Sequence, residues 1–493
     1  MKKLKFDREN GKLVFLVILI LIIITLFTRY YGSADAGDYS DSAKFFSGKY
    51  AGDIRNSHSY LYGFIHSFFV GAFENFFFFK ITSLVCLALI IYSVYYISNK
   101  DRKTLWLILL SPTAWYMAPW ISPIQLSGLF LLWAWYFMKR YDESLKLSNL
   151  FYSGIFIGLG WAVWDTIVFF GAFLAISFLF QRKTSHSLYF VIFVLAGLLP
   201  RLILDQYLFN FPFYTILKSS FGTLTNAFLL GRGSAYVYEN IIKNTLLFLY
   251  IIISIPLYYF FVYKRTSFIK NRKTILFLSA SLLLILINPQ IRYVLSIAPI
   301  IIILTGSYFS DAQFKKQVIF SLLAICFFVF PYVIQMGYNI NDALTGVEVT
   351  SFISDFDKIK FSDRPYREIL SEDIEAIADK FPDQYFIVGP TDDSFQVLCD
   401  VYWGSKVKEF VSVQDYNLYF KNQSVIFSKT FMPEINIRDR RQIWLAGGIS
   451  KNEKDDTPYE EIQYMIVMGE DPGVEGFEKI ETYNRLTLWR KTG

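Results

Sequence analysis

An acidic cluster within residues 34–50, ADAGDYSDSAKFFSGKY, is the feature of this sequence best suited to chemistry. Asp35, Asp38 and Asp41 come directly after a long apolar segment, and Tyr39 stands among them. A carboxylate in such a place is able to take the proton from an attacking hydroxyl group. A group of carboxylates is also able to hold Mg²⁺ or Mn²⁺. The alternative is a polar loop that leaves a membrane without doing chemistry, and the acids alone do not separate the two.

Two arginines are of the type that binds phosphate. Arg292 lies in NPQIRYVLSIAP and is followed by Tyr293, whereas Arg201 lies in LLPRLILDQYLFNFPF, four residues before Asp205. A planar guanidinium binds phosphate oxygens through two parallel hydrogen bonds, so we predict both arginines as phosphate ligands. Two alternatives stay open. Arg292 could anchor a helix end at a membrane surface, and Arg201 could pair with Asp205 one helical turn away.

Three further polar residues are candidates for substrate binding. Asp165, in GWAVWDT, is a carboxylate at the end of an apolar segment, where ionisable groups are often functional. The alternative is an ordinary helix-end acid beside the interfacial Trp164. His58, in RNSHSYLYGF, is either a residue at the membrane interface or a contact to the donor or acceptor. Arg232 lies in the glycine- and aromatic-rich residues 211–238. Long connections of that kind serve as lids or as helices lying on a membrane. The remaining substrate-binding candidates are Tyr39, Asp41, Asp205 and Tyr293.

The composition indicates a membrane protein with a soluble part. Of 493 residues, 54% are hydrophobic and only 18% are charged, against about 25% charged in an ordinary soluble domain. Apolar runs fill residues 1–340, and residues 341–493 have an ordinary charged composition. The net charge of +6 lies mostly in short connections between apolar runs, so topology explains it and nucleic-acid binding is not indicated. Three cysteines and three histidines are too few and scattered for a disulfide framework or a metal motif.

About eleven apolar segments are long enough to span a membrane, given that a span needs ~20 residues. The predicted segments are residues 13–27, 81–97, a pair around Pro119 and Pro123, a pair that turns near Trp164, residues 188–204, one segment before Lys264, one before Asn288, one from about Tyr293, and residues 318–334. Each predicted inner connection is rich in Lys or Arg, as cytoplasmic connections are. This pattern places the N-terminus in the cytoplasm. It places a first loop of residues 30–79, a long loop of residues 205–243 and residues 341–493 together on the outer side.

Residues 341–493 are predicted to form a small extracytoplasmic α/β domain. The predicted helices are residues 371–382 and 394–404, and the predicted strands are residues 384–389, 424–428, 442–447, 464–469 and 485–490. The helices show apolar residues at helical spacing, and the strands are short runs of β-branched and aromatic residues. A glycine-rich phosphate-binding loop is not among these motifs.

Several of these motifs together resemble the GT-C glycosyltransferases. The first-loop pattern of Asp35, Asp38, Tyr39, Ala43 and Gly48 looks like the acidic signature of that family. The segment LLPRLILDQYLFNFPF is similar to one that many members carry after a middle span, and the spacing of Arg292, Tyr293 and Pro299 looks like their late-span motif. The resemblance implies a multi-span enzyme that uses polyprenyl-phosphate sugars. It implies Asp38 as the catalytic base, with Asp35 as the alternative, and Arg292 as a phosphate ligand.

The resemblance therefore predicts a hexosyltransferase, similar to mannosyltransferases, that acts on the outer membrane face. One sugar would pass, with inversion, from a polyprenyl-phosphate donor to a hydroxyl group of a glycan, lipid or protein acceptor. The enzyme would require no cofactor, although Mg²⁺ or Mn²⁺ could bind the acids, and it would lie in the plasma membrane of a prokaryote rather than in the endoplasmic reticulum. The alternatives are a transporter of polysaccharides or lipid-linked oligosaccharides, which would place ionisable groups near the bilayer midplane, and an O-antigen-type polymerase or ligase.

Overall fold

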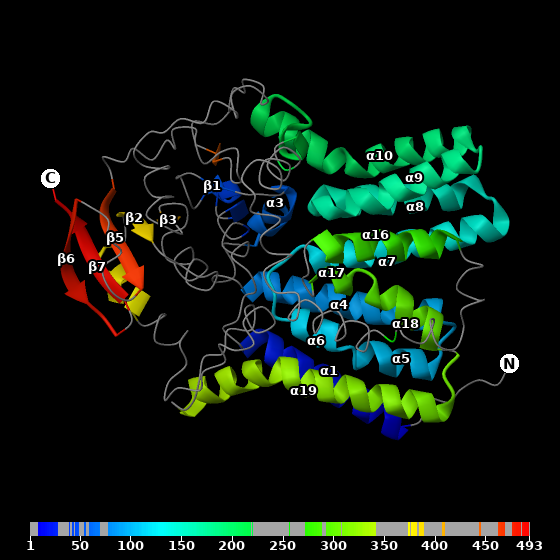
Figure 1. The fold of residues 1–493 in the computed structure, drawn as a ribbon, viewed down its shortest axis with the longest axis horizontal. Coiled ribbons are helices and arrows are strands. Elements are labelled where there is room, and N and C mark those ends of the chain that lie inside the picture. The colour runs from blue at the N-terminus through cyan, green and yellow to red at the C-terminus, as the bar shows by residue number, and fades with distance from the viewer. Residues whose placement is uncertain are drawn as a thin grey trace.

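The computed structural model of the protein describes two bodies, a helical bundle and a small β-sheet (Figure 1). The described residues, which have a few single-residue gaps, are 8–27, parts of 39–48, 54–55, 59–69, 77–217, 219, 256, 272–287, 292–306, 308–341, parts of 373–388, 407–409, 443–444, 462–468 and 476–492. The acidic cluster and most of residues 341–493 thus lie largely outside the described part.

The bundle is built of long apolar helices that run side by side (Figure 1). Its helices are α1 (Arg8–Phe27), α3 (Leu61–Ser67), α4 (Phe77–Ile97), α5 (Arg102–Leu109), α6 (Pro112–Met117), α7 (Ile124–Ser144), α8 (Leu147–Val163), the 3₁₀ turn η1 (Asp165–Ile167), α9 (Val168–Phe180), α10 (Thr184–Phe209), α16 (Arg272–Ile287), α17 (Arg292–Leu295), α18 (Ala298–Gly306) and α19 (Asp311–Asn341). The short helices α6 and α17 lie among the long ones, and the short helix α3 lies at one end of the bundle (Figure 1).

Most of the long described helices fall where the apolar segments of the sequence predict them. The predicted span before Pro119 is divided between α5 and α6, and the one from about Tyr293 is divided between α17 and α18. The segment before Lys264 lies outside the described residues. Two of the described helices, α4 and α10, are long and apolar enough to cross a bilayer by themselves. Shorter apolar helices cover residues 11–26, 147–163 and 167–180. The number of eleven spans therefore stays a prediction.

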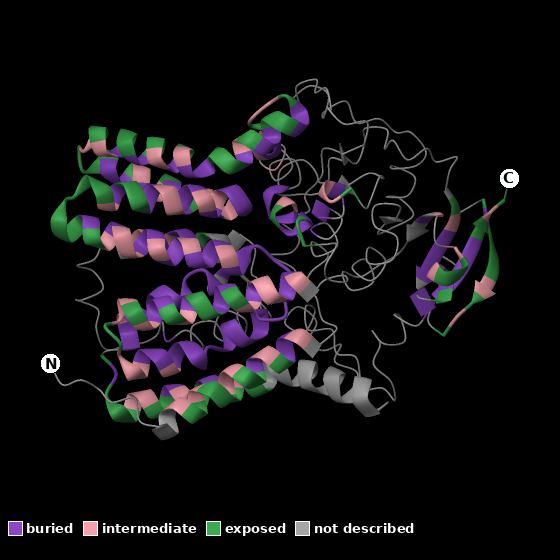
Figure 2. Ribbon diagram, turned by 180° about the vertical axis from the view of Figure 1, so that it is seen from behind, coloured by how far each residue is buried: buried purple, intermediate pink, exposed green. Residues whose placement is uncertain are grey.

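One face of α10 is suited to contact with lipid. Its exposed apolar residues recur every three or four positions, as Leu188, Val191, Ile192, Leu195, Leu199 and Ile203. Such spacing forms a continuous stripe on a helix, and an apolar stripe of this length is unfavourable in water. The helices at the two edges of the bundle carry many of the exposed positions, and the central helices are more buried (Figure 2).

The helix α10 differs from the sequence prediction at its C-terminal end. The sequence predicts a span that ends near Leu204, with Pro200 at its exit and a long loop from Asp205. In the structure the helix continues through Pro200 to Phe209, so the loop begins later than predicted. A proline removes one backbone hydrogen bond of the helix, but it is tolerated within a bundle, where neighbouring groups satisfy the freed backbone carbonyl. As a result Asp205 lies on the helix, one turn beyond Arg201.

The described C-terminal strands form a five-stranded mixed sheet. The order is β3 (Val407–Glu409), β2 (Tyr385–Val388), β5 (Ile462–Met468), β7 (Leu486–Lys491) and β6 (Phe477–Thr482). Strands β3, β2 and β5 are parallel, and β7 and β6 are antiparallel to their neighbours. Helical residues Ile374 and Ile377 pack on this sheet against Phe386 and Ile466. Strands predicted at 384–389, 464–469 and 485–490 are thereby confirmed, whereas β3 and β6 are additional.

A short parallel pairing joins the first loop to the C-terminal part of the chain. Strand β1 (Ile54–Arg55) pairs with β4 (Ile443–Trp444), with Ile54 opposite Ile443. The predicted strand at residues 442–447 is thus present over two residues. The predicted strand at 424–428 and helix at 394–404 lie outside the described residues, and the domain boundary at residue 340 stays a prediction.

Candidate functional site

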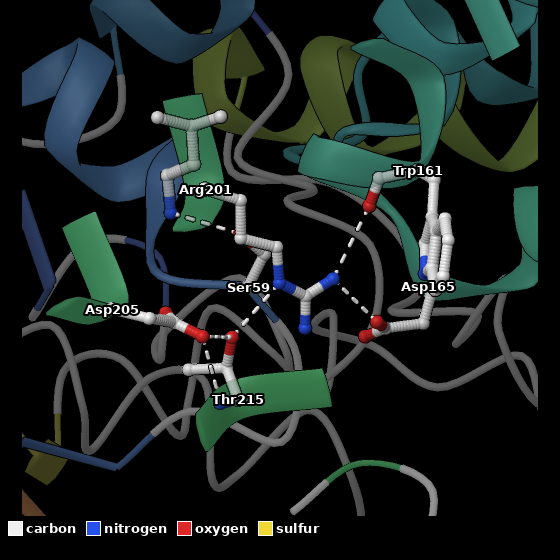
Figure 3. Close-up of polar contacts among 7 residues, drawn as sticks. Ser59, Trp161, Asp165, Arg201, Asp205 and Thr215 are labelled. Carbon is white, nitrogen blue, oxygen red and sulfur yellow. Dashed lines mark hydrogen bonds and ion pairs between the residues drawn. The ribbon is translucent and has the colours of Figure 1, made fainter. Parts of the chain in front are cut away.

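A buried arginine joins two helices at one end of the bundle. Arg201, on α10, has no exposed surface. Its Nη1 atom donates to the carboxylate of Asp165 at 2.5 Å and to the carbonyl oxygen of Trp161 at 3.2 Å. Trp161 lies in the last turn of α8, and Asp165 begins η1, so the guanidinium contacts both sides of the corner between them (Figure 3).

The other side of the same guanidinium reaches Asp205 through a threonine. The Nε atom of Arg201 donates to Thr215 Oγ1 at 2.8 Å, and that hydroxyl donates to Asp205 Oδ2 at 2.7 Å. The backbone N–H of Thr215 also donates to Asp205 Oδ2, at 2.9 Å (Figure 3). The spacing of Arg201 and Asp205 left open a direct pair, and the structure instead links them through Thr215, which folds back onto α10.

The network combines one guanidinium with two carboxylates. A buried charge is costly unless it is paired and hydrogen-bonded, and Arg201 lies between two carboxylates among the described residues. Within the described part of the chain, its Nη2 atom is buried without a hydrogen-bond partner. Asp165 and Asp205 were candidates for substrate binding. The structure brings both to Arg201, and their role toward a substrate stays a prediction.

The corner held by Arg201 also carries a second contact. The ring of Trp164, between Trp161 and Asp165, stacks on the ring of Tyr293 with centroids 5.6 Å apart and planes 12° apart. Tyr293 is buried and belongs to the four-residue helix α17, whose first residue is Arg292. The backbone of Arg292 is therefore next to this corner, and its side chain lies outside the described part of the structure.

The first loop packs on α3 through Tyr39. This side chain is buried and meets Tyr62 edge to face, with centroids 5.1 Å apart. Gly63 permits the approach, because a Cβ atom there would lie 2.4 Å from Ser42 Cβ and 3.2 Å from the carbonyl oxygen of Tyr39. The helical residues Tyr39, Ser42 and Ala43 are thus held against α3, and they flank the sequence positions of Asp38 and Asp41.

A buried histidine fixes α3 to α4. His66 makes a 2.7 Å hydrogen bond through Nδ1 to the carbonyl oxygen of Tyr62 and a 3.0 Å hydrogen bond through Nε2 to Thr82 Oγ1. Its ring stacks on Phe79 at 4.1 Å. Burial lowers the pKa of His66 to about 4, so the ring is neutral at pH 7. The next residue after Phe79, Lys80, is also buried and lies near the start of α4.

Aromatic contacts connect α3 with the Arg201 network. Tyr60, just before α3, contacts Phe209 at the end of α10, with ring centroids 6.0 Å apart. Phe209 stacks on Tyr214 at 3.9 Å, and Tyr214 precedes Thr215. Ser59, next to Tyr60, lies near the same network in Figure 3. The described first-loop residues, Arg201 and α17 therefore share one end of the bundle.

The roles of the other sequence candidates stay predictions. Asp35, Asp38, Asp41, His58 and Arg232 lie outside the described residues. The part of the chain that is described contains no group of three His, Cys, Asp or Glu side chains able to hold a metal ion. Binding of Mg²⁺ or Mn²⁺ by the acidic cluster stays a prediction.

Comparison with known proteins identifies the fold. No protein-family model matches this sequence, and no curated protein matches it. The structure superposes on a crystal structure of ArnT from Cupriavidus metallidurans bound to undecaprenyl phosphate with a TM-score of 0.55, over 98% of both chains, at 10% identity. The apo form of the same protein gives a TM-score of 0.51 over the same shares and at the same identity.

The chain has the ArnT fold. The predicted GT-C resemblance is thereby confirmed for the architecture, and the ArnT fold is that of an integral membrane protein. The match over nearly the whole chain includes the C-terminal region, which the sequence predicts as a separate domain. At 10% identity, the roles of individual residues do not follow from this match.

Three described residues at the shared end of the bundle were missed in the sequence. Lys80 had a usable signal, since it stands next to four phenylalanines at the start of an apolar segment, where a charge is costly. His66 had a weaker one as one of only three histidines. Thr215 had none, because a threonine ten residues after Asp205 shares no helical spacing with it.

Proposed function

We propose that the protein transfers one sugar from a polyprenyl-phosphate donor to a hydroxyl acceptor at the outer membrane face. The observation that carries the proposal is the likeness, over 98% of both chains, to an ArnT structure that holds undecaprenyl phosphate. The acidic first loop supports it independently, because the sequence places carboxylates where a lipid phosphate meets the aqueous phase. The donor class comes from the first observation and the catalytic base from the second.

The reaction requires one base and one anion-binding group. Asp38 takes the proton from the acceptor hydroxyl, whose oxygen attacks the anomeric carbon of the donor sugar. A new glycosidic bond forms as the bond from the anomeric carbon to the phosphate oxygen breaks, with inversion. The electron pair leaves with the phosphate, and the product lipid is a polyprenyl monophosphate. Arg292 stabilises the charge that develops on that phosphate.

The described contacts support this assignment through the neighbours of each residue. Tyr39 is next to Asp38 in sequence and is buried against Tyr62, so the loop is held at a defined place on α3. Tyr293 is next to Arg292 and is stacked on Trp164. A catalytic group acts efficiently only when its neighbours fix its position. The acceptor could be a glycan, a lipid or a protein, since nothing in the described residues favours one of them.

The base is tested by separate Asp38→Asn and Asp35→Asn variants of the purified full-length protein. We expect Asp38→Asn to lower turnover of an undecaprenyl-phosphate sugar by about 10²–10⁴-fold, the usual contribution of a general base. Asp35→Asn should have a smaller effect. The matched control is Asp311→Asn, which removes an acid paired with Lys103 at the start of α19 and should leave turnover unchanged. Wild-type turnover in both first-loop variants, at equal protein level, would show that neither acid is the base.

A further inference from the structure

The corner between α8 and η1 is held by contacts that differ in kind. Arg201 contacts it through a carboxylate on η1 and a backbone carbonyl on α8. Thr215 holds the other edge of the guanidinium. A guanidinium presents its donors in a rigid planar fork, so these contacts fix the corner relative to α10 more tightly than any one of them would.

The same corner supports α17 through an aromatic stack. Trp164 lies between the two residues that Arg201 contacts, and its ring covers Tyr293 with nearly parallel planes. Helix α17 has only four residues, too few for a helix to be stable by itself. Its position is therefore set by neighbours, and the buried Tyr293 is its described aromatic contact with the α8–η1 corner.

We propose that Arg201 is a positioning residue that fixes the α8–η1 corner and, through the Trp164–Tyr293 stack, sets the position of α17 and its first residue, Arg292. This inference rests on the proposed function, in which Arg292 holds the donor phosphate. It gives Arg201 a role different from the direct phosphate contact expected from its residue type.

The charges around Arg201 favour this role over direct binding of phosphate. One carboxylate pairs with the guanidinium, and a second is joined to it by a single hydroxyl group. A phosphate that approached Arg201 would also approach Asp165 and Asp205, and like charges at short range in a buried place repel strongly. The positive charge of Arg201 is already paired with Asp165. A positioning role needs only these existing contacts and no free charge for a phosphate.

The first test measures backbone amide exchange of residues 292–296 in the purified full-length protein, without any donor. We expect Arg201→Lys to speed exchange there by about tenfold or more, because lysine cannot hold Thr215 and Asp165 together and α17 would open more often. Trp164→Ala should have the same effect. The matched control is Ser153→Ala, which removes a buried hydrogen bond from α8 to the carbonyl oxygen of Ala134; it should leave exchange of residues 292–296 unchanged.

The second test is a double-mutant cycle on the KM for an undecaprenyl-phosphate sugar. Arg201→Lys should raise this KM by about tenfold with less change in kcat, the pattern of weakened binding. Once Arg292→Ala has removed the phosphate ligand, Arg201→Lys should add no more than about a twofold effect, because both changes act through one residue. Thr215→Val should raise the KM as Arg201→Lys does. Thr215→Ser keeps the hydroxyl group and should have the KM of the wild-type protein.

The two tests fail separately. Unchanged amide exchange in Arg201→Lys would overturn the link from Arg201 to α17, whatever the activity. Independent, multiplying effects of Arg201→Lys and Arg292→Ala on KM would overturn the positioning role, because Arg201 would then contact the donor itself. A wild-type protein that uses no polyprenyl-phosphate donor would instead contradict the proposed function, and the exchange result would still decide whether Arg201 holds α17.

Discussion

Arg201 shows at the residue scale what sequence spacing can and cannot predict. Its spacing to Asp205 correctly indicated that the two residues are coupled, because residues four apart share a helix face. The third member, Thr215, and the ion-pair partner, Asp165, come from other segments, and their distances in sequence follow no helical period. The predicted role of Arg201 as a phosphate ligand stays a prediction, and the geometry that links α8, α10 and α17 required the fold.

At the same scale, His66 predicts a specific pH dependence of stability. Burial lowers the pKa of this ring from 6.5 to about 4, so between these values the unfolded chain binds a proton that the folded chain does not. The contribution of the neutral ring to the free energy of unfolding is fully present above pH 6.5 and is lost as the pH falls toward 4. The loss amounts to about 3 kcal/mol, an order-of-magnitude value.

The measurement compares thermal unfolding of the wild-type protein and of His66→Gln, which does not titrate, in detergent at pH 7.5 and pH 4.5. The wild type should lose more stability than the variant over this interval. Carboxylates that titrate in the same interval affect both proteins equally and cancel in the comparison. Equal losses in the two proteins would show that the ring is not held neutral.

At the scale of elements, the sequence predicted the helices well and their close approaches poorly. Apolar runs and basic connections predict where α1, α4, α8 and α19 lie, because span length and loop charge are both strongly constrained. The short helix α17 carries no such signal, and its tyrosine–tryptophan stack joins residues more than a hundred positions apart. The crossing of α8 and α10 depends on single glycines, which look unremarkable in an apolar run.

The packing of α8 on α10 gives a sharp prediction. A Cβ atom at Gly158 would lie 2.1 Å from the carbonyl oxygen of Val194, and one at Gly197 would lie 2.3 Å from the carbonyl oxygen of Ile155. Backbone atoms cannot move aside as a side chain can, so Gly158→Ala should destabilise the protein by about 1–3 kcal/mol. The control is Gly128→Ala, whose Cβ would find its nearest neighbour at 3.7 Å.

Thermal unfolding in detergent measures both variants. Gly158→Ala should lower the midpoint clearly, whereas Gly128→Ala should match the wild type or exceed it, because alanine favours the helix over glycine. A similar midpoint for all three proteins would mean that α8 and α10 are farther apart than in this structure.

At the scale of the whole molecule, the sequence placed the first loop and the C-terminal region on the same side of the membrane. The pairing of β1 with β4 agrees with that arrangement, since it joins Ile54 in the first loop to Ile443, and the C-terminal sheet lies at the end of the bundle away from the N-terminus (Figure 1). The pairing itself was not predictable, because two residues carry no strand pattern. Fold class was predictable because composition and basic connections constrain the entire chain.

This arrangement predicts that Ile54→Cys and Ile443→Cys form a disulfide when combined in a protein without its native cysteines. Neighbouring strands hold paired Cα atoms about 5 Å apart, inside the range for a disulfide. Mild oxidation followed by proteolysis and a non-reducing gel reports the bond. Ile54→Cys combined with Ile480→Cys, on β6, is the control that should remain unlinked.

Reporter fusions after Lys49 and after Ser371 should both be extracytoplasmic, and a cytoplasmic signal from either would contradict the topology.

The most direct test of the central claim is the chemical form of the lipid product. The purified protein is given an undecaprenyl-phosphate-linked sugar and an acceptor mixture. The lipids are then separated, and mass spectrometry identifies and quantifies them. We predict undecaprenyl monophosphate, released in proportion to the sugar transferred. An unaltered donor, as expected of a transporter, or turnover only with diphosphate-linked glycans, as expected of a polymerase or ligase, would contradict the account.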